Sequence, residues 1–325
     1  MINVAVIGLG RWGKNIVESV QGKSKHLRII RGVSKEPGLV ADFAKAKGFE
    51  LSTDFDEAIA DPRVQAVCLA TPHSLHLQQI QAVAALGKPL WCEKPLALTR
   101  AESAKAIAAI KKAGVVFALG NNKRCFASMR ELKRVVADGT IGEVMHIEGN
   151  FTNEHSTRVL GGWRDDPNES PGGGMTGAGM HIIDAFVSMA GHIASVDAHV
   201  FHKKPAPDPR DAAAALVKFE SGATGTLATV RAAPAYWRVM VFGTKGWAEA
   251  RDETILTTAL VGQPPETKVY PQVDSLGTLL ESFGAAAETG SPFAVTTDDM
   301  VEVAGAFEAI IKSMAQGTPM KVEHD

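Results

Sequence analysis

The stretch Gly8-Leu9-Gly10-Arg11-Trp12-Gly13 decides the fold expected for this 325-residue chain. It follows an apolar run, Asn3–Ile7, and leads into Trp12–Val20, whose apolar residues recur at helical spacing. Three glycines in the order GxGxxG between a strand and a helix provide a tight turn, a close approach of backbone to a pyrophosphate, and close packing of helix on strand. This context favours a phosphate-binding turn over a glycine turn that holds no ligand. The residues expected to contact a dinucleotide here are Gly8, Gly10, Arg11, Trp12 and Gly13.

The same alternation of strand and helix continues outward from this turn to Gly120. Short, wholly apolar runs are typical of strands in a parallel sheet that is covered by helices on both faces. The expected strands are Asn3–Ile7, Leu27–Val33, Ala66–Ala70, Pro89–Cys92 and Val115–Leu119. The expected helices are Trp12–Val20, Leu39–Lys47, Phe55–Ala60, Ser74–Leu86 and Arg100–Ala113. This order predicts an α/β, doubly wound sheet of the Rossmann type over residues 1–120.

The rhythm changes after Gly120, where we place the boundary to a second domain, residues 121–325. A chain of this length is longer than one hydrophobic core usually serves, so two domains are expected. Consecutive strands joined by short turns such as Glu220-Ser221-Gly222 indicate an α+β domain with a mostly antiparallel sheet. Its expected strands are Val144–Phe151, Ser195–Phe201, Ala213–Phe219, Ala223–Val230, Arg238–Phe242 and Trp247–Ala250. Its expected helices are Phe126–Asp138, Met175–Ala190, Ser275–Glu288 and Asp298–Met314.

The composition argues against several classes of protein. The net charge is −2, with Lys and Arg interspersed among acids, so no nucleic-acid-binding surface is expected. No apolar run is long enough to cross a bilayer and no signal-like region opens the chain, which favours a cytoplasmic protein. Three widely spaced cysteines, Cys68, Cys92 and Cys125, predict neither a disulfide framework nor a zinc site, and we expect no metal centre.

The end of the second strand bears on the choice of cofactor. NAD-binding sites place an Asp or Glu there to accept a hydrogen bond from the ribose 2′-hydroxyl. This chain has Val33-Ser34-Lys35 instead, and Glu36 lies two residues too late. Ser34 is able to donate to a 2′-phosphate and Lys35 to neutralise it. NADP(H) is therefore favoured, and NAD(H) remains possible, with Ser34 and Lys35 then plain loop residues.

A turn after the 66–70 strand provides the next expected cofactor contacts. The carboxyl ends of the strands form the edge at which doubly wound sheets bind ligands. Pro72 stiffens this turn, and a helix opens directly after it. We expect His73 and His76 to line or cap the groove rather than to act as catalysts. The residues predicted to line the cofactor groove here are Ala70, Thr71, Pro72 and His76.

The segment Glu93-Lys94-Pro95 ends the 89–92 strand at the same edge. A lysine in a partly dry cleft beside a nicotinamide has a lowered pKa and exchanges a proton with a substrate hydroxyl near neutral pH. We therefore predict that Lys94 is the catalytic acid/base and that Glu93 orients it, with both residues next to the cofactor. The alternative is a surface ion pair.

These motifs together resemble the glucose–fructose oxidoreductase/inositol dehydrogenase (Gfo/Idh/MocA) family. The resemblance begins with the GxGxxG, the Thr71-Pro72…His76 turn and Glu93-Lys94-Pro95-Leu96. It continues through Gly120…Arg124-Cys125-Phe126, Gly139-Thr140-Ile141-Gly142-Glu143-Val144, Trp163-Arg164 and Gly172-Gly173-Gly174…Gly179-Met180-His181. It implies a Rossmann domain followed by a domain built on a large open sheet. The exposed face of that sheet commonly forms a subunit interface, so a homodimer or homotetramer is expected.

The resemblance also implies roles for particular residues. Lys94 matches the catalytic lysine of the family, and His181 matches a second acid/base histidine. The family usually has an aspartate four residues before this histidine, where this chain has Gly177. Its absence puts specificity for polyols or sugars in doubt and leaves space for a bulkier or anionic substrate. Asp184 is expected to support the site from behind.

Several other side chains are candidates for contact with the substrate. Basic and amide groups are able to surround a carboxylate, and tryptophan is able to stack on a ring. The candidates beside His181 are Asn122, Lys123, Arg124, His155, Trp163, Arg164 and Trp237. The alternative is an exposed basic residue or, for the tryptophans, a core residue.

The interpretation that we carry forward is an NAD(P)-dependent oxidoreductase. It moves a hydride between the nicotinamide and a hydroxyl-bearing carbon of a small sugar, polyol, cyclic diol or hydroxy acid. The alternatives are a non-catalytic dinucleotide-binding sensor or regulatory protein, and a redox-assisted lyase or glycosidase. Tightly held cofactor and turnover without added NAD(P) would distinguish the lyase or glycosidase from the oxidoreductase.

Overall fold

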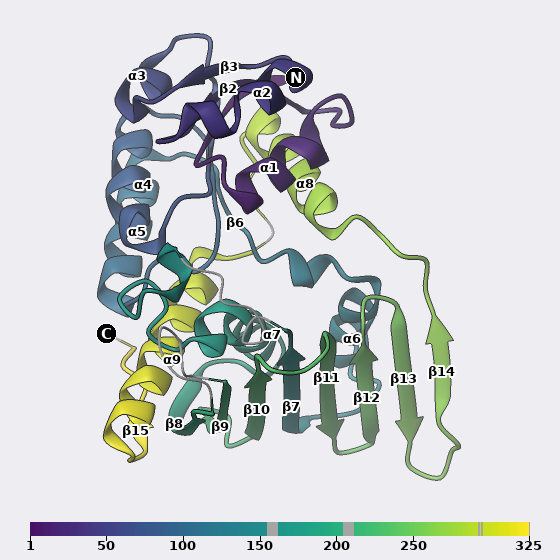
Figure 1. Ribbon diagram of the computed structural model, residues 1–325. Coiled ribbons are helices and arrows are strands. Elements are labelled where there is room, and N and C mark those ends of the chain that lie inside the picture. Colours follow the sequence, from purple (N-terminus) through teal and green to yellow (C-terminus); the bar gives the residue numbers. More distant parts are fainter. Residues whose placement is uncertain (155–161, 204–210, 292, 294, 325) are drawn as a thin grey trace. The chain divides into compact units, whose positions relative to one another are not determined.

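Figure 1 shows the computed structural model of the protein, which describes residues 1–154, 162–203, 211–291, 293 and 295–324. The chain divides into two compact units. The first comprises Met1–Ala97, Ala101–Asn122 and Asp274–Met300, and the second comprises Leu98–Arg100, Lys123–Val273 and Val301–Asp325. The predicted substrate contact His155 lies outside the described residues. Within the described ranges, no helix is long and apolar enough to pass through a membrane.

The first unit is built on a parallel sheet with the strand order β3-β2-β1-β4-β5-β6. Its strands are β1 (Ile2–Ile7), β2 (Leu27–Val33), β3 (Glu50–Ser52), β4 (Ala66–Leu69), β5 (Leu90–Cys92) and β6 (Phe117–Leu119). Its helices are α1 (Arg11–Val20), α2 (Ala41–Lys47), α3 (Phe55–Ala60), α4 (His76–Ala85), α5 (Arg100–Ala113) and α8 (Ser275–Thr289). The strand order reverses between β1 and β4, which is the Rossmann topology, so the predicted doubly wound sheet is confirmed.

The strands at the centre of this sheet are buried on both faces. Val4, Ala5 and Val6 are each 0% exposed, and all four residues of β4 are buried. Burial on both faces explains why the sequence shows continuous apolar runs here instead of alternation. The edge strand β3 is absent from the predicted elements because it is only three residues long and two of them are polar.

Helix α8 joins the first unit from a distant part of the sequence. It packs on α1 and β1, and a Cβ on Gly284 would lie 2.6 Å from the Cβ of His26. The Glu288 carboxylate lies 2.6 Å from Nδ1 of His26 and 2.7 Å from the N-terminal amine. The domain boundary that we expected after Gly120 would instead assign α8 to the second domain. The sequence of α8 shows an apolar face, which indicates that the helix packs on another element. It does not indicate which of the two units that element belongs to.

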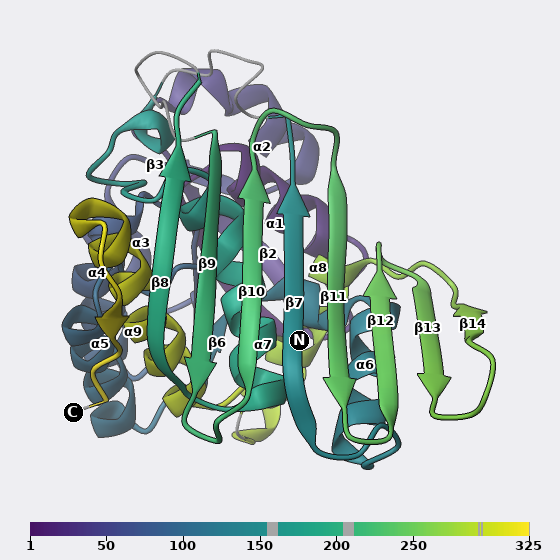
Figure 2. The same ribbon diagram turned by 90° about the horizontal axis from the view of Figure 1, so that it is seen from below.

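The second unit is built on a sheet of nine strands among the described residues, in the order β14-β13-β12-β11-β7-β10-β9-β8-β15 (Figure 2). The strands are β7 (Val144–Thr152), β8 (Ile193–Phe201), β9 (Ala212–Phe219), β10 (Thr224–Val230), β11 (Tyr236–Gly243), β12 (Gly246–Arg251), β13 (Ile255–Leu260), β14 (Glu266–Val269) and β15 (Met320–Lys321). β7 and β10 run parallel, and the other neighbouring pairs run antiparallel. The predicted large, mostly antiparallel sheet is therefore confirmed.

Helices cover one face of this sheet. α6 (Ala127–Ala137) contacts β12 and β13, and α7 (Met180–Ala190) contacts β7. The opposite face, which is turned toward the viewer in Figure 2, carries no helix of the described part of the unit. β9 alternates accordingly: the odd-numbered residues from Ala213 to Phe219 are buried, and Ala214, Leu216 and Lys218 are exposed.

The strands at one edge of the sheet do not emerge from the sequence pattern. All four residues of β14 are exposed and only Val269 is apolar, so no apolar run or alternation marks it as a strand. β13 (Ile255–Leu260) mixes apolar and threonine positions without strict alternation. Both elements depend on pairing with the neighbouring strand, which a local pattern does not record.

Candidate active site

The glycine turn of the first unit has three distinct steric constraints. Gly8 has φ +90°, and a Cβ there would lie 2.6 Å from the carbonyl oxygen of Ala70. A Cβ on Gly13 would lie 1.9 Å from the carbonyl oxygen of Gly8, so α1 meets the end of β1 only because residue 13 has no side chain. Nothing lies within 4 Å of a Cβ position on Gly10, the exposed N-cap of α1. The first N–H groups of a helix lack partners within the helix, so this open turn is suited to phosphate.

The loops predicted to hold the cofactor leave the sheet at one edge. Ile7 of β1 pairs with Leu69 of β4, and Leu69 pairs with Cys92 of β5. Gly8, Ala70 and Glu93, which directly follow these residues, therefore leave three neighbouring strands at the same level. This edge lies at the reversal of strand order, where open α/β sheets bind their ligands.

His76 connects two of these loops and is 0% exposed. Its Nδ1 lies 2.8 Å from the carbonyl oxygen of Pro95, and its Nε2 lies 3.1 Å from the carbonyl oxygen of Thr71. The Thr71 hydroxyl donates to Oε1 of Gln79 at 2.6 Å. The histidine predicted to line the cofactor groove thus positions the Thr71-Pro72 turn against the Lys94-Pro95 turn.

Ser34 directly follows β2, and hydrogen bonds to neighbouring backbone groups fix its position. Ser34 N–H donates to the carbonyl oxygen of Ser52 at 3.1 Å. Its Oγ accepts from the N–H of Glu36 at 3.2 Å, which orients the hydroxyl and leaves its hydrogen available to donate. Lys35 and Glu36 are exposed. Arg11 is also exposed, and its guanidinium lies 5.7 Å from the ring centre of the half-buried Trp12.

The Glu93-Lys94 pair begins the loop after β5. Glu93 is 7% exposed, and its N–H donates to the carbonyl oxygen of Leu69 at 2.9 Å. Burial, and to a smaller extent the nearby Glu93 carboxylate, raises the pKa of the Cys68 and Cys92 thiols, so both stay protonated and unreactive. Lys94 is half-buried, and its peptide bond to Pro95 is cis. Lys94 is thus partly shielded from water at the ligand edge of the sheet.

In the second unit, His181 stands at the start of α7. A Cβ on Gly149 in β7 would lie 2.3 Å from Cγ2 of Ile182, so the bare backbone of Gly149 lets α7 lie close against the sheet. His181 is 5% exposed, and its ring centre is 6.1 Å from that of Phe151. The close approach of helix and sheet therefore brings this histidine against an aromatic side chain of β7.

A π-helical turn precedes His181. The sequence predicts one continuous helix over Met175–Ala190, but Met175–Gly179 forms a π-helix that continues into α7. Such turns are rare and occur often at functional sites. Gly177 lies in this turn, is exposed, and has nothing within 4 Å of a Cβ position. The place where the family usually has an aspartate is open space.

Asp184 and Arg124 form a bidentate pair beneath His181. Arg124 Nε donates to Oδ2 of Asp184 at 2.7 Å, and Nη2 donates to Oδ1 at 2.6 Å. The Asp184 side chain is 3% exposed and that of Arg124 is 15% exposed. Arg124, predicted as a substrate contact, therefore binds Asp184, a residue of α7.

Lys123 lies in an aromatic environment, in the 3₁₀ turn Asn122–Cys125. Its Nζ is 4.2 Å from the ring centre of Phe126 and 5.4 Å from that of Phe151. Burial lowers the pKa of Lys123 to about 8, although the charge of Glu253 acts in the opposite direction. An amine with this pKa exchanges protons readily near neutral pH.

A small cavity adjoins this lysine. Its volume of about 20 Å³ is enough for one water molecule. The residues that line it are Lys123, Arg124, Met129, Lys133, His181, Asp184, Ala185, Ser188, Met189 and Trp237. Trp237 is 4% exposed and packs edge-on against Phe126 and Phe151, which makes it a core residue.

The remaining predicted substrate contacts belong to different units. Asn122 belongs to the first unit, where its Nδ2 donates to Oγ of Ser275 at 3.0 Å. Trp163 and Arg164 belong to the second unit and stack on each other, with the guanidinium 4.1 Å from the ring centre. Trp163 is half-buried and Arg164 is exposed. The structure does not bring Asn122 together with this stacked pair within one unit.

Arg231 is a buried arginine that the sequence patterns did not single out. It directly follows β10, is 8% exposed, and places Nη2 4.0 Å from Oδ1 of Asp165. Burial lowers its pKa, against the effect of Asp165. A Cβ on Gly174 would lie 2.8 Å from Cγ of Arg231, so the run Gly172-Gly173-Gly174 was the available signal that a bulky group packs there.

Comparison with known proteins adds to this geometry. A sequence profile described as "Oxidoreductase family, NAD-binding Rossmann fold" matches residues 2–121, and one described as "GFO/IDH/MocA C-terminal domain" matches residues 129–249. The chain is 30% identical to scyllo-inositol 2-dehydrogenase (NAD(+)) of Bacillus subtilis over 75% of its own length and 72% of the relative.

Two solved structures share the whole architecture. An oxidoreductase from Desulfitobacterium hafniense, provisionally named NADPH-dependent, matches 99% of this chain and 97% of its own, with a TM-score of 0.87 and 25% identity. Levoglucosan dehydrogenase in complex with NADH and L-sorbose matches 100% of this chain and 99% of its own, with a TM-score of 0.90 and 23% identity. At 23% identity, the similarity to levoglucosan dehydrogenase is evidence for the fold alone.

The pKa of Lys123 predicts how stability changes with pH. The folded pKa is about 8 and the ordinary value is 10.5. Between these values the unfolded chain binds a proton that the folded chain lacks, so the free energy of unfolding rises with pH. Relative to a Lys123→Met variant, the wild type should gain up to about 3 kcal/mol between pH 8 and pH 10.5, and nothing below pH 8.

Urea denaturation of both proteins at pH 7 and pH 10 measures this difference. Lys133→Met, which removes an exposed lysine of α6, is the control and should show no such dependence. A stability difference between wild type and Lys123→Met that is equal at both pH values would contradict the assignment.

Proposed function

The chain belongs to the Gfo/Idh/MocA family of NAD-binding oxidoreductases, and from this premise we propose that it is a dehydrogenase or reductase acting on a CH–OH group. The substrate is a small sugar, polyol, cyclic diol or hydroxy acid. One observation carries the proposal: the phosphate turn after β1 and the Glu93-Lys94 loop after β5 leave the same edge of one sheet. A dinucleotide whose phosphates lie on the turn extends along this edge.

Lys94 is the proposed acid/base. In oxidation its neutral amine takes the proton of the substrate hydroxyl while the C–H hydrogen leaves as hydride, and in reduction the ammonium returns the proton. The bound nicotinamide supplies the hydride acceptor or donor at C4. Glu93 and His76 position Lys94, the first as its buried neighbour and the second through the carbonyl oxygen of Pro95.

We assign His181 of the second unit to the same reaction, as the family resemblance implies, and Lys123 to the binding of substrate oxygens. His181 and Lys123 both contact the ring of Phe151. A lysine amine is able to donate hydrogen bonds to substrate oxygens, and when protonated it attracts an anionic group. The open space at Gly177 and the absence of a carboxylate there support a substrate that carries negative charge, such as a hydroxy acid, alongside neutral polyols.

NADP(H) is the proposed cofactor, with NAD(H) as the alternative. The Ser34 hydroxyl retains a hydrogen to donate, and the exposed Lys35 adds positive charge beside it. A 2′-phosphate is bound by such donors and repelled by the carboxylate that NAD-binding sites place at this position.

The uncovered face of the nine-stranded sheet is the proposed interface between two copies of this chain. Large apolar side chains stand exposed on it, with Phe201 61%, Leu216 54% and Tyr236 38% exposed. The small side chains of Ala214 and Ala228, which pair across β9 and β10, lie in a hollow of about 290 Å³. A hollow beside protruding apolar residues suits a self-complementary dimer contact.

Replacement of Lys94 tests the mechanism. Lys94→Ala should lower turnover by about 10²- to 10⁴-fold because the proton then has no positioned acceptor. Binding of cofactor, measured as a rise in melting temperature with NADPH or NADH, should persist. Turnover is measured with NADP⁺ or NAD⁺ and a panel of myo-inositol, scyllo-inositol, levoglucosan and small hydroxy acids.

Lys112→Ala, at the exposed end of α5, is the matched control and should leave turnover unchanged. Near-normal turnover of Lys94→Ala would overturn the mechanism. The wild type could instead bind cofactor and yet convert none of the panel, either with or without added cofactor. That result would favour the non-catalytic dinucleotide-binding sensor.

A single substitution tests the choice of cofactor. Ser34→Asp places a carboxylate where the 2′-phosphate is proposed to bind, and should weaken NADPH binding at least about tenfold while favouring NADH. Ser34→Asn introduces a side chain of the size of Asp without its charge, and should retain most of the preference for NADPH. Titration of each cofactor by intrinsic fluorescence gives the two dissociation constants. Tighter binding of NADH than of NADPH by the wild type would refute this assignment.

The proposed subunit interface predicts a charge-sensitive oligomer. Leu216→Arg should convert the wild-type dimer or tetramer to smaller species at micromolar concentration, because an unpaired charge would be buried in the contact. Leu86→Arg, at the exposed end of α4 in the first unit, is the control. Light scattering coupled to size-exclusion chromatography gives the mass, and a monomeric wild type would rule out the interface.

A further inference from the structure

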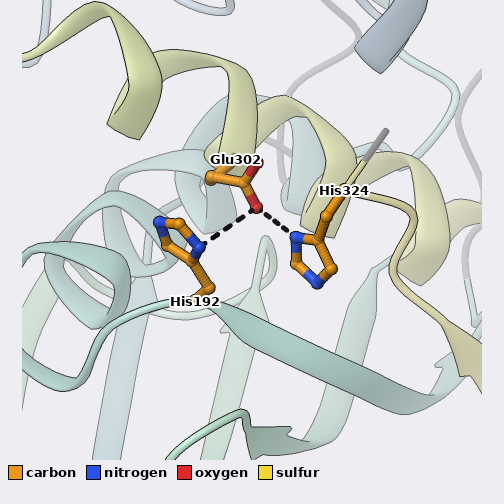
Figure 3. A group of neighbouring side chains, drawn as sticks. All are labelled: His192, Glu302 and His324. Carbon is orange, nitrogen blue, oxygen red and sulfur yellow. Dashed lines mark hydrogen bonds and ion pairs between the residues drawn. The ribbon is translucent and has the colours of Figure 1, made fainter.

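Two histidines and a glutamate meet in the second unit from segments far apart in the sequence (Figure 3). His192 lies between α7 and β8, Glu302 lies in α9 (Thr297–Gln316), and His324 follows β15. One nitrogen or oxygen of each side chain lies within 4.8 Å of those of the other two. None of the three belongs to the active site proposed above.

The two imidazole rings face the same carboxylate oxygen. Nδ1 of His324 lies 2.5 Å and Nδ1 of His192 lies 3.9 Å from Oε2 of Glu302, as the dashed lines in Figure 3 show. The rings are nearly parallel, at 16°, with centres 5.8 Å apart. Zinc bonds of about 2.0–2.2 Å in a tetrahedron separate ligand atoms by about 3.4 Å. To reach this spacing, Nδ1 of His192, whose side chain is 42% exposed, moves about 0.5 Å toward Oε2, and Nδ1 of His324 moves about 0.9 Å away from it.

The other oxygen of Glu302 is already engaged. Nη2 of Arg100 lies 3.3 Å from Oε1 of Glu302, and it also donates to the carbonyl oxygen of His324. The Glu302 side chain is 9% exposed, so this pairing gives a buried carboxylate a partner and fixes its orientation. Metal-binding carboxylates are typically held by such a hydrogen bond on the second oxygen.

Glu220 stands on the more exposed side of the cluster. Its Oε2 lies 3.8 Å from Nδ1 of His192, and its Oε1 lies 3.5 Å from Nε2 of His324. That Nε2 is buried and makes no hydrogen bond of normal geometry. With Glu220, Glu302 and Arg100 charged, these three groups sum to one negative charge, which favours a cation.

We propose that His192, Glu302 and His324 bind one zinc ion, with Glu220 accepting from the second ring nitrogen of His324. Two imidazole nitrogens and a carboxylate oxygen are a ligand set typical of zinc rather than of magnesium or calcium, which prefer oxygen alone. A water molecule takes the fourth position. The ion ties the segment after β15 to α9 and to the start of β8.

This proposal revises the expectation of no metal centre. That expectation rested on the spacing of the cysteines, whereas these ligands come from three separate segments with no common motif. The competing explanation is a hydrogen-bonded cluster in which His324 donates to Glu302 without a metal. The two explanations differ in what zinc does to the protein.

The test uses the full-length chain without a polyhistidine tag, treated with EDTA and dialysed. Added ZnCl₂ should bind at one ion per chain, measured by mass spectrometry of the metal after gel filtration, and should raise the melting temperature by about 5 °C. MgCl₂ at the same concentration should not change the melting temperature. Replacement of zinc by Co²⁺ should give the visible absorption bands of a tetrahedral site.

His192→Ala and Glu302→Gln should each abolish the stoichiometric zinc and the rise in melting temperature. His192 is the more informative variant, because its exposed side chain is removed without disturbing the His324–Glu302 pair. The control is His199→Ala, which removes the exposed partner of Asp197 at 3.3 Å and should leave zinc binding intact. Less than 0.2 zinc ions per wild-type chain, or equal zinc in His192→Ala and wild type, would overturn the proposal.

Discussion

The contact between Gly13 and the carbonyl oxygen of Gly8 is the constraint on which the ligand edge of the first unit depends. A Cβ at residue 13 would lie 1.9 Å from that oxygen, so any side chain would force α1 away from β1. With α1 in place, its N-terminus lies over the end of β1, where its unpaired N–H groups are available to phosphate. The parallel register from β1 through β4 to β5 then sets where the other loops begin.

A buried histidine extends this constraint from one loop to the next. His76 lies between the carbonyl oxygens of Thr71 and Pro95, so movement of one turn displaces the other. The position of Lys94 is thereby coupled to the turn that follows β4. In the second unit, Gly149 has a role comparable to that of Gly13, because its missing side chain lets α7 approach the sheet close to His181, near the start of the helix.

The sequence was sufficient to predict the elements whose residues carry the signal themselves. Apolar runs marked β1 and β4 because burial on both faces requires them, and the GxGxxG marked the turn because Gly8 and Gly13 leave no room for a side chain and Gly10 leaves the turn open. Residues 266–269 carry no such signal, since β14 is exposed throughout and exists through pairing alone. The placement of α8 in the first unit is likewise a long-range choice that its own amphipathic pattern does not contain.

The candidate site shows the same division. Position in a motif singled out Lys94 and His181 as candidates, but the partners of Arg124 and Asn122 lie far along the chain and could not be read locally.

Arg124, Arg231 and Arg100 share one physical explanation, because each is a largely buried charge close to a carboxylate, respectively on Asp184, Asp165 and Glu302. Burial without such a partner would cost more than a fold of marginal stability tolerates. For Lys123, the charge of Glu253 offsets only part of the effect of burial on the pKa, which therefore falls to about 8. A charge left under-compensated in this way is costly in the absence of ligand, and an anionic group bound beside it would remove that cost. The same reasoning that makes the arginine pairs structural therefore supports our proposal that Lys123 binds substrate oxygens.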